Sequence, residues 1–201
     1  MKNARLWAVE WKQGGELLEA IEPTKEELER AAPALAAFYN DDHNRQMMAH
    51  GDEPHAPADV IAYYDVLRAE GGRPFLLYLD GLLMGDADFR NIEDGAGEFA
   101  IMVGGRAAQG RGLGTRFARM LHLFGFGILG LARIYISVIP ANTASRRLFE
   151  KLGYQMDDSA QAREFIDEES DLTMSLARAT FDRAHTDDLS AIRLFERPPS
   201  S

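Results

Sequence analysis

Apolar and polar residues follow one another along this chain in two distinct patterns, which predict strands and helices. Short apolar runs bounded by glycine or other turn residues are typical of strands. Such runs occur at about residues 5–11, 16–22, 75–79, 82–89, 98–103, 134–139, 154–156 and 172–176. Apolar residues spaced three or four positions apart are typical of amphipathic helices. They occur at about residues 25–39, 57–70, 113–130 and 143–152.

Two features near the start of the chain bear on the first helix. Thr24 followed by Glu27 is a capping-box signature, so the helix should begin near Lys25. Pro33 lies inside the same helical pattern. Because proline has no N–H group and its ring crowds the preceding turn, we expect the helix to be kinked or split there.

Two polar stretches interrupt or end the pattern. Residues 40–58 predict a long loop, and loops of this length in compact domains are often functional. Residues 180–201 are polar and end in Arg-Pro-Pro-Ser-Ser. We expect a single domain over residues 1–179, followed by a C-terminal tail that is frayed or weakly helical.

The strongest functional signal is the segment Gln109-Gly110-Arg111-Gly112-Leu113-Gly114-Thr115, which stands between a predicted strand and a long predicted helix. Glycines let the backbone approach an anion closely, and the first N–H groups of the helix point toward it. The pattern therefore predicts a phosphate-binding loop, although a simple tight turn is the other interpretation. A Rossmann fingerprint would need glycine where Thr115 stands, and a Walker loop would need Gly-Lys-Ser/Thr, which this chain lacks.

A second signature follows the next predicted strand. It is the segment Asn142-Thr-Ala-Ser145-Arg-Arg-Leu-Phe149-Glu-Lys-Leu-Gly153-Tyr154. Together with the spacing Gln-x-x-Gly-x-Gly in the glycine-rich loop, this order resembles the GNAT acetyltransferase superfamily over residues 75–176. The resemblance implies an α/β (α+β) fold with a mixed, mostly antiparallel central sheet of six to seven strands, flanked by about four helices. The order strand, helix, strand in the chain itself also predicts that the strand after the loop's helix lies parallel to the strand before the loop.

The same resemblance implies acetyl-CoA as the acyl donor, with no metal. Main-chain N–H groups of the loop would hold the pyrophosphate; these belong to Gln109, Gly110, Arg111, Gly112, Leu113, Gly114 and Thr115. Met102 and Val103 would pair with the pantetheine arm, and Asn142 would contact the same arm. Since relatives are often dimers, a homodimer is also expected.

Glu98 is the candidate general base for transfer to a primary amine, because it begins the strand that leads to the loop and relatives often carry a glutamate there. The general acid is harder to assign. Many relatives carry a tyrosine where this chain has Phe149, and a phenyl ring cannot donate a proton. Tyr154 is the remaining candidate, although five residues further on it can face elsewhere. Either another group serves, or the thiolate leaves unassisted, or the protein is not an efficient catalyst.

Asp86 and Asp88 alternate along the strand predicted at 82–89, so their side chains share one face. Two carboxylates on one face could help to bind a cation. The interpretation we favour from the sequence is an exposed strand face.

Composition and charge narrow the class of partner. A net charge of −10 disfavours nucleic acid and anionic membranes, and it suits a cationic amine acceptor such as a polyamine-like or aminoglycoside-like molecule. A protein N-terminus or lysine fits nearly as well, and acidity that only keeps the protein in solution is an equal alternative. The absence of cysteine excludes disulfides and a cysteine nucleophile, and we expect a cytoplasmic protein. A non-catalytic acyl-CoA-binding or interaction module on the same fold is the alternative function, and Phe149 is the feature that favours it.

Overall fold

The computed structural model describes residues 5–48, 53–104 and 110–198 of this 201-residue chain. Within these ranges a single nine-stranded sheet runs in the order β7-β8-β6-β5-β4-β3-β2-β1-β9. The strands are β1 (Trp7–Gln13), β2 (Glu16–Ile21), β3 (Arg73–Leu79), β4 (Leu82–Glu93), β5 (Ala96–Val103), β6 (Arg133–Val138), β7 (Gln155–Met156), β8 (Leu172–Ala177) and β9 (Ile192–Glu196). Neighbouring strands are antiparallel except β5 and β6, which are parallel. The mixed, mostly antiparallel sheet is confirmed, and it is larger than the six to seven strands expected.

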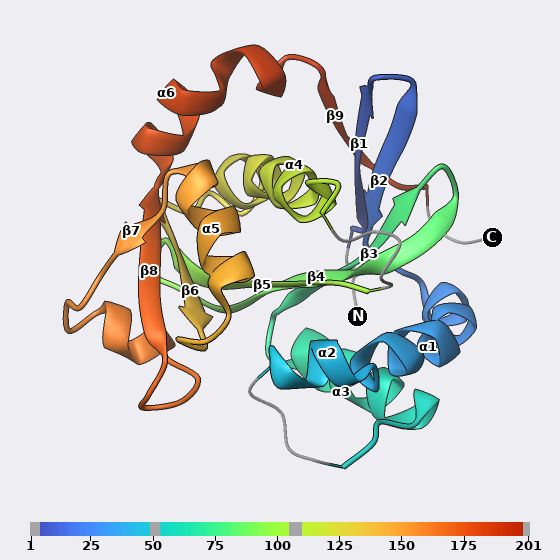
Figure 1. The fold of residues 1–201 in the computed structure, drawn as a ribbon. Helices are drawn as coiled ribbons and strands as arrows, with labels where there is room; N and C mark the ends of the chain where they lie inside the picture. Colours follow the sequence, from blue (N-terminus) through green and yellow to red (C-terminus); the bar gives the residue numbers. More distant parts are fainter. Residues whose placement is uncertain (1–4, 49–52, 105–109, 199–201) are drawn as a thin grey trace.

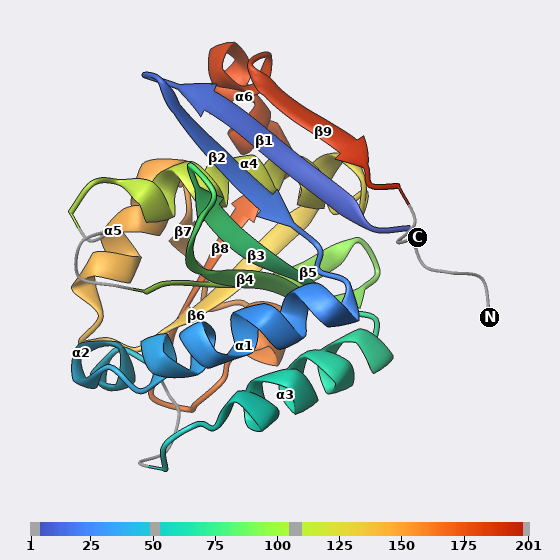
Figure 2. The same cartoon turned by 90° about the vertical axis from the view of Figure 1, so that its right-hand side faces the viewer.

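Helices lie on both sides of this sheet. They are α1 (Lys25–Tyr39), α2 (Asp42–Gln46), α3 (Pro57–Ala69), α4 (Leu113–Gly127), α5 (Thr143–Leu152) and α6 (Arg178–Leu189), with a short 3-10 helix η2 (Ala162–Phe165). Figures 1 and 2 show α1, α2 and α3 on one side and α4, α5 and α6 on the other. Each side has its own buried apolar cluster, the larger one around α4 and the smaller one between α1 and α3. None of the helices in the described ranges is long and apolar enough to cross a membrane.

The start of α1 follows the sequence prediction, but its course does not. The Thr24 hydroxyl accepts from the Glu27 main-chain N–H at 3.2 Å, and the Glu27 carboxylate accepts from the Thr24 N–H at 2.8 Å. The helix then runs through Pro33 to Tyr39 as one element, so the expected split into two helices was wrong. Leu35 and its apolar neighbours on α1 are buried, and this burial offsets the hydrogen bond that proline cannot make. Residues 42–46, predicted as loop, form the short helix α2.

The segment predicted as a polar tail instead forms α6 and the edge strand β9. Figure 1 shows α6 crossing over α4 and leading the chain to the opposite edge of the sheet. Phe181 of α6 is fully buried in the main core, and β9 pairs antiparallel with β1 from Trp7↔Glu196 to Trp11↔Ile192. The segment is ordered because one aromatic anchor joins the main core and because β1 offers an unpaired edge.

The parallel pairing between β5 and β6 is short, and this leaves room for a candidate site between the two strands. The parallel register covers only Ala96↔Arg133, Gly97↔Ile134 and Glu98↔Tyr135. Beyond these residues the two strands diverge (Figure 1). The later part of β5 therefore faces a gap on this side instead of a neighbouring strand.

Candidate active site

Two adjoining cavities open where β5 and β6 diverge. The first, about 420 Å³, lies between β4, β5, β6 and the helices α1, α3 and α5, and we call it the acidic cavity. Six carboxylate side chains line it: Asp59, Asp86, Asp88, Glu98, Asp167 and Asp171. The second, about 530 Å³, lies between the glycine-rich loop, β5 and the helices α2, α4 and α5, and we call it the loop cavity.

Most of the residues predicted to bind the cofactor line the loop cavity. They are Met102, Val103, Gly110, Gly112, Leu113, Gly114, Thr115 and Asn142. Gln109 lies outside the described residues. The Arg111 side chain forms an ion pair with Glu16 at 2.6 Å and is not among the lining groups of this cavity.

The backbone around Gly112 has the form that the loop prediction requires. Gly112 is the N-cap of α4 and has φ of 71°, a left-handed conformation that glycine adopts without steric cost. A Cβ atom added to Gly114 would lie 2.7 Å from Leu148 of α5, so the first turn of α4 packs closely on α5. Arg147 and Lys151 add positive charge to the same cavity. The opening beside a helix N-terminus and two cations fits a phosphorylated ligand.

Asp86 and Asp88 lie in a different environment from the exposed strand face expected. Both are buried, with 5% and 9% of their surface exposed, and both line the acidic cavity. One Asp86 oxygen accepts hydrogen bonds from the hydroxyls of Tyr39, at 2.5 Å, and Tyr64, at 2.9 Å. Burial raises the pKa of Asp86 to about 6, and the two tyrosine hydrogen bonds limit that rise.

Asp88 is less well satisfied than Asp86. Its Oδ1 atom is buried and has no hydrogen-bond partner within the described part of the chain. The other oxygen accepts only a long hydrogen bond of 3.5 Å from Tyr63. Burial raises the pKa of Asp88 to about 7, while Arg90 opposes the rise. A buried carboxylate that titrates near neutral pH and has a free oxygen is suited to accepting a proton.

Glu98, the predicted base, lines the acidic cavity and is 2% exposed. Both of its oxygens are already engaged: Arg90 Nη2 donates to one at 2.5 Å and Asn91 Nδ2 donates to the other at 2.8 Å. Arg90 also pairs with Asp167 at 3.1 Å. These contacts favour a role in holding Arg90 at the cavity wall over a role as proton acceptor.

Tyr154, the predicted acid, lies in the core. It is 3% exposed, its hydroxyl is 2.6 Å from His122 Nε2, and it lines neither of the two cavities. Burial raises the pKa of Tyr154 well above its ordinary value and lowers that of His122 to about 3. This position corrects the sequence assignment, because a group held inside the core cannot reach a thiol in either cavity. Phe149 does line the acidic cavity.

The sequence prediction missed the tyrosines that surround the aspartates. Tyr39 stands at the end of α1, and Tyr63 and Tyr64 stand in the middle of α3. Their spacing along the two helices is compatible with ordinary core positions, so the pattern carries no functional signal. Only the packing of α1 and α3 against β4 brings their hydroxyls to Asp86 and Asp88.

With this geometry established, comparison with known proteins identifies the family. The model of the acetyltransferase (GNAT) domain matches residues 21–155, which is more than half of the chain. The chain therefore belongs to the GNAT acetyltransferase family.

The individual proteins that match this chain have low sequence identity to it. The spermidine N(1)-acetyltransferase of Escherichia coli (strain K12) is 28% identical over 130 residues, 62% of this chain and 69% of that protein. Mycobacterium smegmatis RimJ, solved in complex with CoA-disulfide, matches with a TM-score of 0.71 and 18% identity over 92% of this chain and 96% of that chain. AAC(6')-Ib in complex with ribostamycin and coenzyme A matches with a TM-score of 0.69 and 22% identity, over 85% and 98% of the two chains. At these identities the two structural matches establish a shared fold.

Proposed function

We propose that this protein transfers the acetyl group of acetyl-CoA to the primary amine of a small cationic acceptor. Membership of the GNAT acetyltransferase family supports acetyl transfer to an amine. The two adjoining cavities support a two-substrate reaction, with acetyl-CoA in the loop cavity and the amine in the acidic cavity.

Several features of the loop cavity support acetyl-CoA as the donor. Main-chain N–H groups beside Gly112 and Gly114 would hold the pyrophosphate at the N-terminus of α4. Arg147 and Lys151 supply positive charge for phosphate groups. The pantetheine arm would then follow β5 past Val103, where β6 no longer pairs with it.

The acidic cavity supports a cationic acceptor. Six carboxylates line it, and the lining residues include one arginine, Arg90. An ammonium group would supply the hydrogen-bond donor that Asp88 Oδ1 lacks, and it would offset part of the free-energy cost of burying this carboxylate. A neutral amine would gain much less from the same position.

The proton steps follow from this placement. Ionised Asp88 takes one proton from the bound ammonium group, so that the neutral nitrogen can attack the acetyl carbon. As the new carbon–nitrogen bond forms, the carbon–sulfur bond breaks and its electron pair stays on sulfur. The second proton lost by the nitrogen then neutralises the thiolate. The single observation that carries this proposal is the buried, partly unpartnered carboxylate of Asp88 beside the diverging strands.

A panel of amines assayed with acetyl-CoA tests the proposal. We expect free thiol to appear with di- and polyamines or amino sugars, and much more slowly with a neutral-tailed primary amine of similar size. The acetylated position is read by mass spectrometry. Binding of acetyl-CoA without turnover for any amine would contradict the proposal and favour the non-catalytic module that Phe149 suggests.

A further inference from the structure

One carboxylate, that of Glu16 on β2, holds two arginines on either side of the point where α4 begins. Glu16 Oε1 accepts from Arg111 Nη2 at 2.6 Å, and Glu16 Oε2 accepts from Arg116 Nη1 at 2.6 Å. Arg111 lies two residues before α4 begins at Leu113, and Arg116 lies in its first turn. The two arginines therefore bracket the main-chain N–H groups that we propose for the pyrophosphate.

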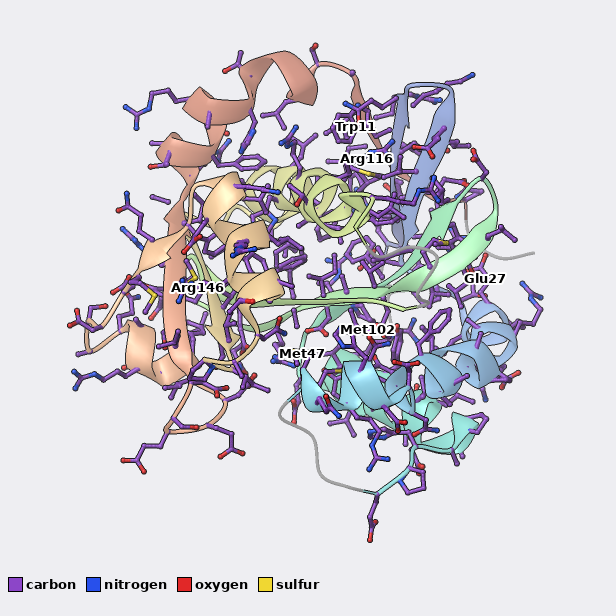
Figure 3. The ribbon with its side chains drawn as sticks, in the orientation of Figure 1. Trp11, Glu27, Met47, Met102, Arg116 and Arg146 are labelled. Carbon is purple, nitrogen blue, oxygen red and sulfur yellow. The ribbon has the colours of Figure 1, made fainter. Side chains whose placement is uncertain are left out.

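The hairpin of β1 and β2 brings Glu16 to this place. Glu16 and Leu18 are two residues apart on β2, so both side chains lie on the sheet face that packs against α4. Leu18 is fully buried in the main core, and the Arg119 guanidinium of α4 lies over the Trp11 ring of β1 at 5.7 Å. Figure 3 shows Trp11 and Arg116 where α4 approaches the hairpin. This packing fixes the hairpin against α4, and so it fixes the position of the Glu16 carboxylate.

The glycine-rich loop needs such a fixed point because its own backbone has little preference for one form. Gly110 and Gly112 have φ of 75° and 71°, and a Cβ atom added to either would meet no atom within 4 Å. Glycine also loses more conformational freedom on ordering than any other residue. Arg111 lies between the two glycines, and its side chain reaches Glu16 instead of the loop cavity. The ion pair therefore restrains the loop and leaves the cavity to the main chain.

The charge of Glu16 by itself works against anion binding. The hydrogen bond from Arg116 lowers the pKa of Glu16, so this carboxylate is ionised at neutral pH. A negative charge this close to a phosphate site repels the ligand. Its place there is therefore unfavourable for the ligand unless it improves the geometry of the groups that bind the phosphates.

We infer that Glu16 is a positioning residue for the donor substrate: its ion pairs with Arg111 and Arg116 hold the glycine-rich loop and the first turn of α4 in the form that receives the pyrophosphate of acetyl-CoA. This inference rests on the proposed acetyl transfer. Glu16 lines neither the loop cavity nor the acidic cavity, so it acts through the two arginines. It affects the binding of acetyl-CoA and leaves the chemical step unchanged.

The variant Glu16→Gln keeps the size of the side chain and removes its charge. We expect the Kd of acetyl-CoA, measured by calorimetry, to rise about three- to tenfold, with kcat at saturating acetyl-CoA within about twofold of that of the unmodified protein. Loss of a negative charge alone would instead tighten the binding of this anionic donor. The sign of the change therefore separates positioning from charge.

Glu10→Gln is the matched control, because it removes the same charge from the same hairpin. Glu10 pairs with Arg193 at 3.2 Å and lines neither cavity, so the Kd of acetyl-CoA should not rise in this variant. Arg111→Gln removes the loop contact from its exposed end and leaves the pair of Glu16 with Arg116 in place. It should also raise the Kd, and the double variant Glu16→Gln/Arg111→Gln should bind no more weakly than the weaker single variant. Tighter or unchanged binding in Glu16→Gln, or losses that simply add in the double variant, would overturn the inference.

A second measurement needs no ligand. Hydrogen exchange of the main-chain amides of residues 110–116 in the free protein, followed by mass spectrometry, reports how firmly this segment is held. We expect faster exchange in Glu16→Gln than in Glu10→Gln, and equal exchange in the two variants would also overturn the inference. If acetyl-CoA does not bind to the unmodified protein, the proposed function fails, while this measurement still decides whether Glu16 holds the loop.

Discussion

Asp86 and Asp88 are two positions apart on β4, yet their surroundings suit them to different tasks. Two tyrosine hydroxyls hold one oxygen of Asp86, whereas Oδ1 of Asp88 has no partner in the described structure. Each hydrogen bond to a carboxylate stabilises its charged form, so burial is less compensated at Asp88. The pKa values follow this order, about 6 for Asp86 and about 7 for Asp88. Asp88 is therefore the carboxylate that changes protonation closest to neutral pH.

The variant Asp88→Asn removes the proposed proton acceptor. We expect kcat/KM to fall by about 10²- to 10⁴-fold, the usual contribution of a general base. The rise in kcat/KM centred near pH 7 should disappear, because the group with that pKa is gone. The measurement is kcat/KM for the acceptor as a function of pH, with the acceptor concentration varied and acetyl-CoA saturating.

Stability supplies an independent readout for the same variant. The pKa of Asp88 is raised in the folded protein, so the folded state binds more protons than the unfolded chain between about pH 4 and pH 7. The stability of the unmodified protein should therefore fall as pH rises through this range. Asp88→Asn should be the more stable protein at pH 8 in urea unfolding, and the difference should shrink toward pH 4.

Glu98→Gln is the matched comparison for Asp88→Asn. Glutamine keeps the size of the side chain but weakens the ion pair with Arg90. We expect kcat/KM to fall less than in Asp88→Asn, and the rise near pH 7 to persist. If the rise in kcat/KM near pH 7 were lost in Glu98→Gln and kept in Asp88→Asn, Glu98 would be the general base.

The alternation of β4 was enough to predict that Asp86 and Asp88 share a face, but not that the face is buried. The partners of Asp86 are 47 and 22 residues earlier in the chain, on α1 and α3. Burial therefore depends on the packing of helices whose pattern specifies only that they have an apolar side. The same limit explains Tyr154, whose place in the core depends on His122 of α4.

At the scale of elements, the glycine-rich loop and α4 act as one unit. Gly112 closes the N-terminus of α4 in a left-handed conformation, and the loop cavity lies against the first turn. A Cβ atom at Gly112 would meet no other atom within 4 Å, so a larger side chain there would enter the space that Gly112 lines.

Gly112→Trp should therefore block the loop cavity. We expect the affinity for acetyl-CoA to fall at least about tenfold, measured by calorimetry, because the indole occupies the place of the phosphates. Gly130→Trp is the control: Gly130 has φ of +69°, also meets no atom within 4 Å, and lines none of the cavities described above. Both variants should lose roughly 1–2 kcal/mol of stability from left-handed strain. Equal affinity in the two variants would contradict a phosphate site at the loop.

The elements that the sequence predicted well are those with local signals. The hairpin of β1 and β2, the capping box of α1, and the order β5, loop, α4, β6 and α5 each depend on turns, caps and periodicity within a few residues. The elements α6 and β9 lack such signals. α6 is largely polar, and β9 is stabilised by pairing with β1, at the far end of the chain.

At the scale of the whole molecule, Arg197 joins the end of β9 to the start of α1. Its guanidinium donates to both oxygens of Glu27, at 2.6 and 2.9 Å, and to the Glu22 carbonyl at 2.5 Å. Glu27 is also the capping-box residue of α1, and the hydrogen bond from Arg197 lowers its pKa. One side chain thus connects the last strand to the helix that carries Tyr39 toward the acidic cavity.

We expect Arg197→Ala to lower the free energy of unfolding by about 1–2 kcal/mol, since a two-pronged and partly buried ion pair is lost. Arg193→Ala, on β9 just before Arg197, is the matched control. Its ion pair with Glu10 is 3.2 Å long, and the Arg193 side chain is 76% exposed, so its removal should cost less than about 0.5 kcal/mol. Urea denaturation compares the two variants. Equal losses would mean that the Arg197 contacts contribute no more than an ordinary surface pair.

The pairing of β1 with β9 also has a mechanical consequence. Trp7 stands opposite Glu196, so the two ends of the described chain leave the sheet from the same end of one strand pair. A pulling force applied through both termini would separate β1 from β9 one residue pair at a time. The force would act along the inter-strand hydrogen bonds, which lie perpendicular to the strands, so these bonds would break in sequence. The diverging strands β5 and β6 are separated from β9 by the four strands β4, β3, β2 and β1. A molecule tethered by its ends should therefore yield first at this edge, at low force, while the cavities keep their shape.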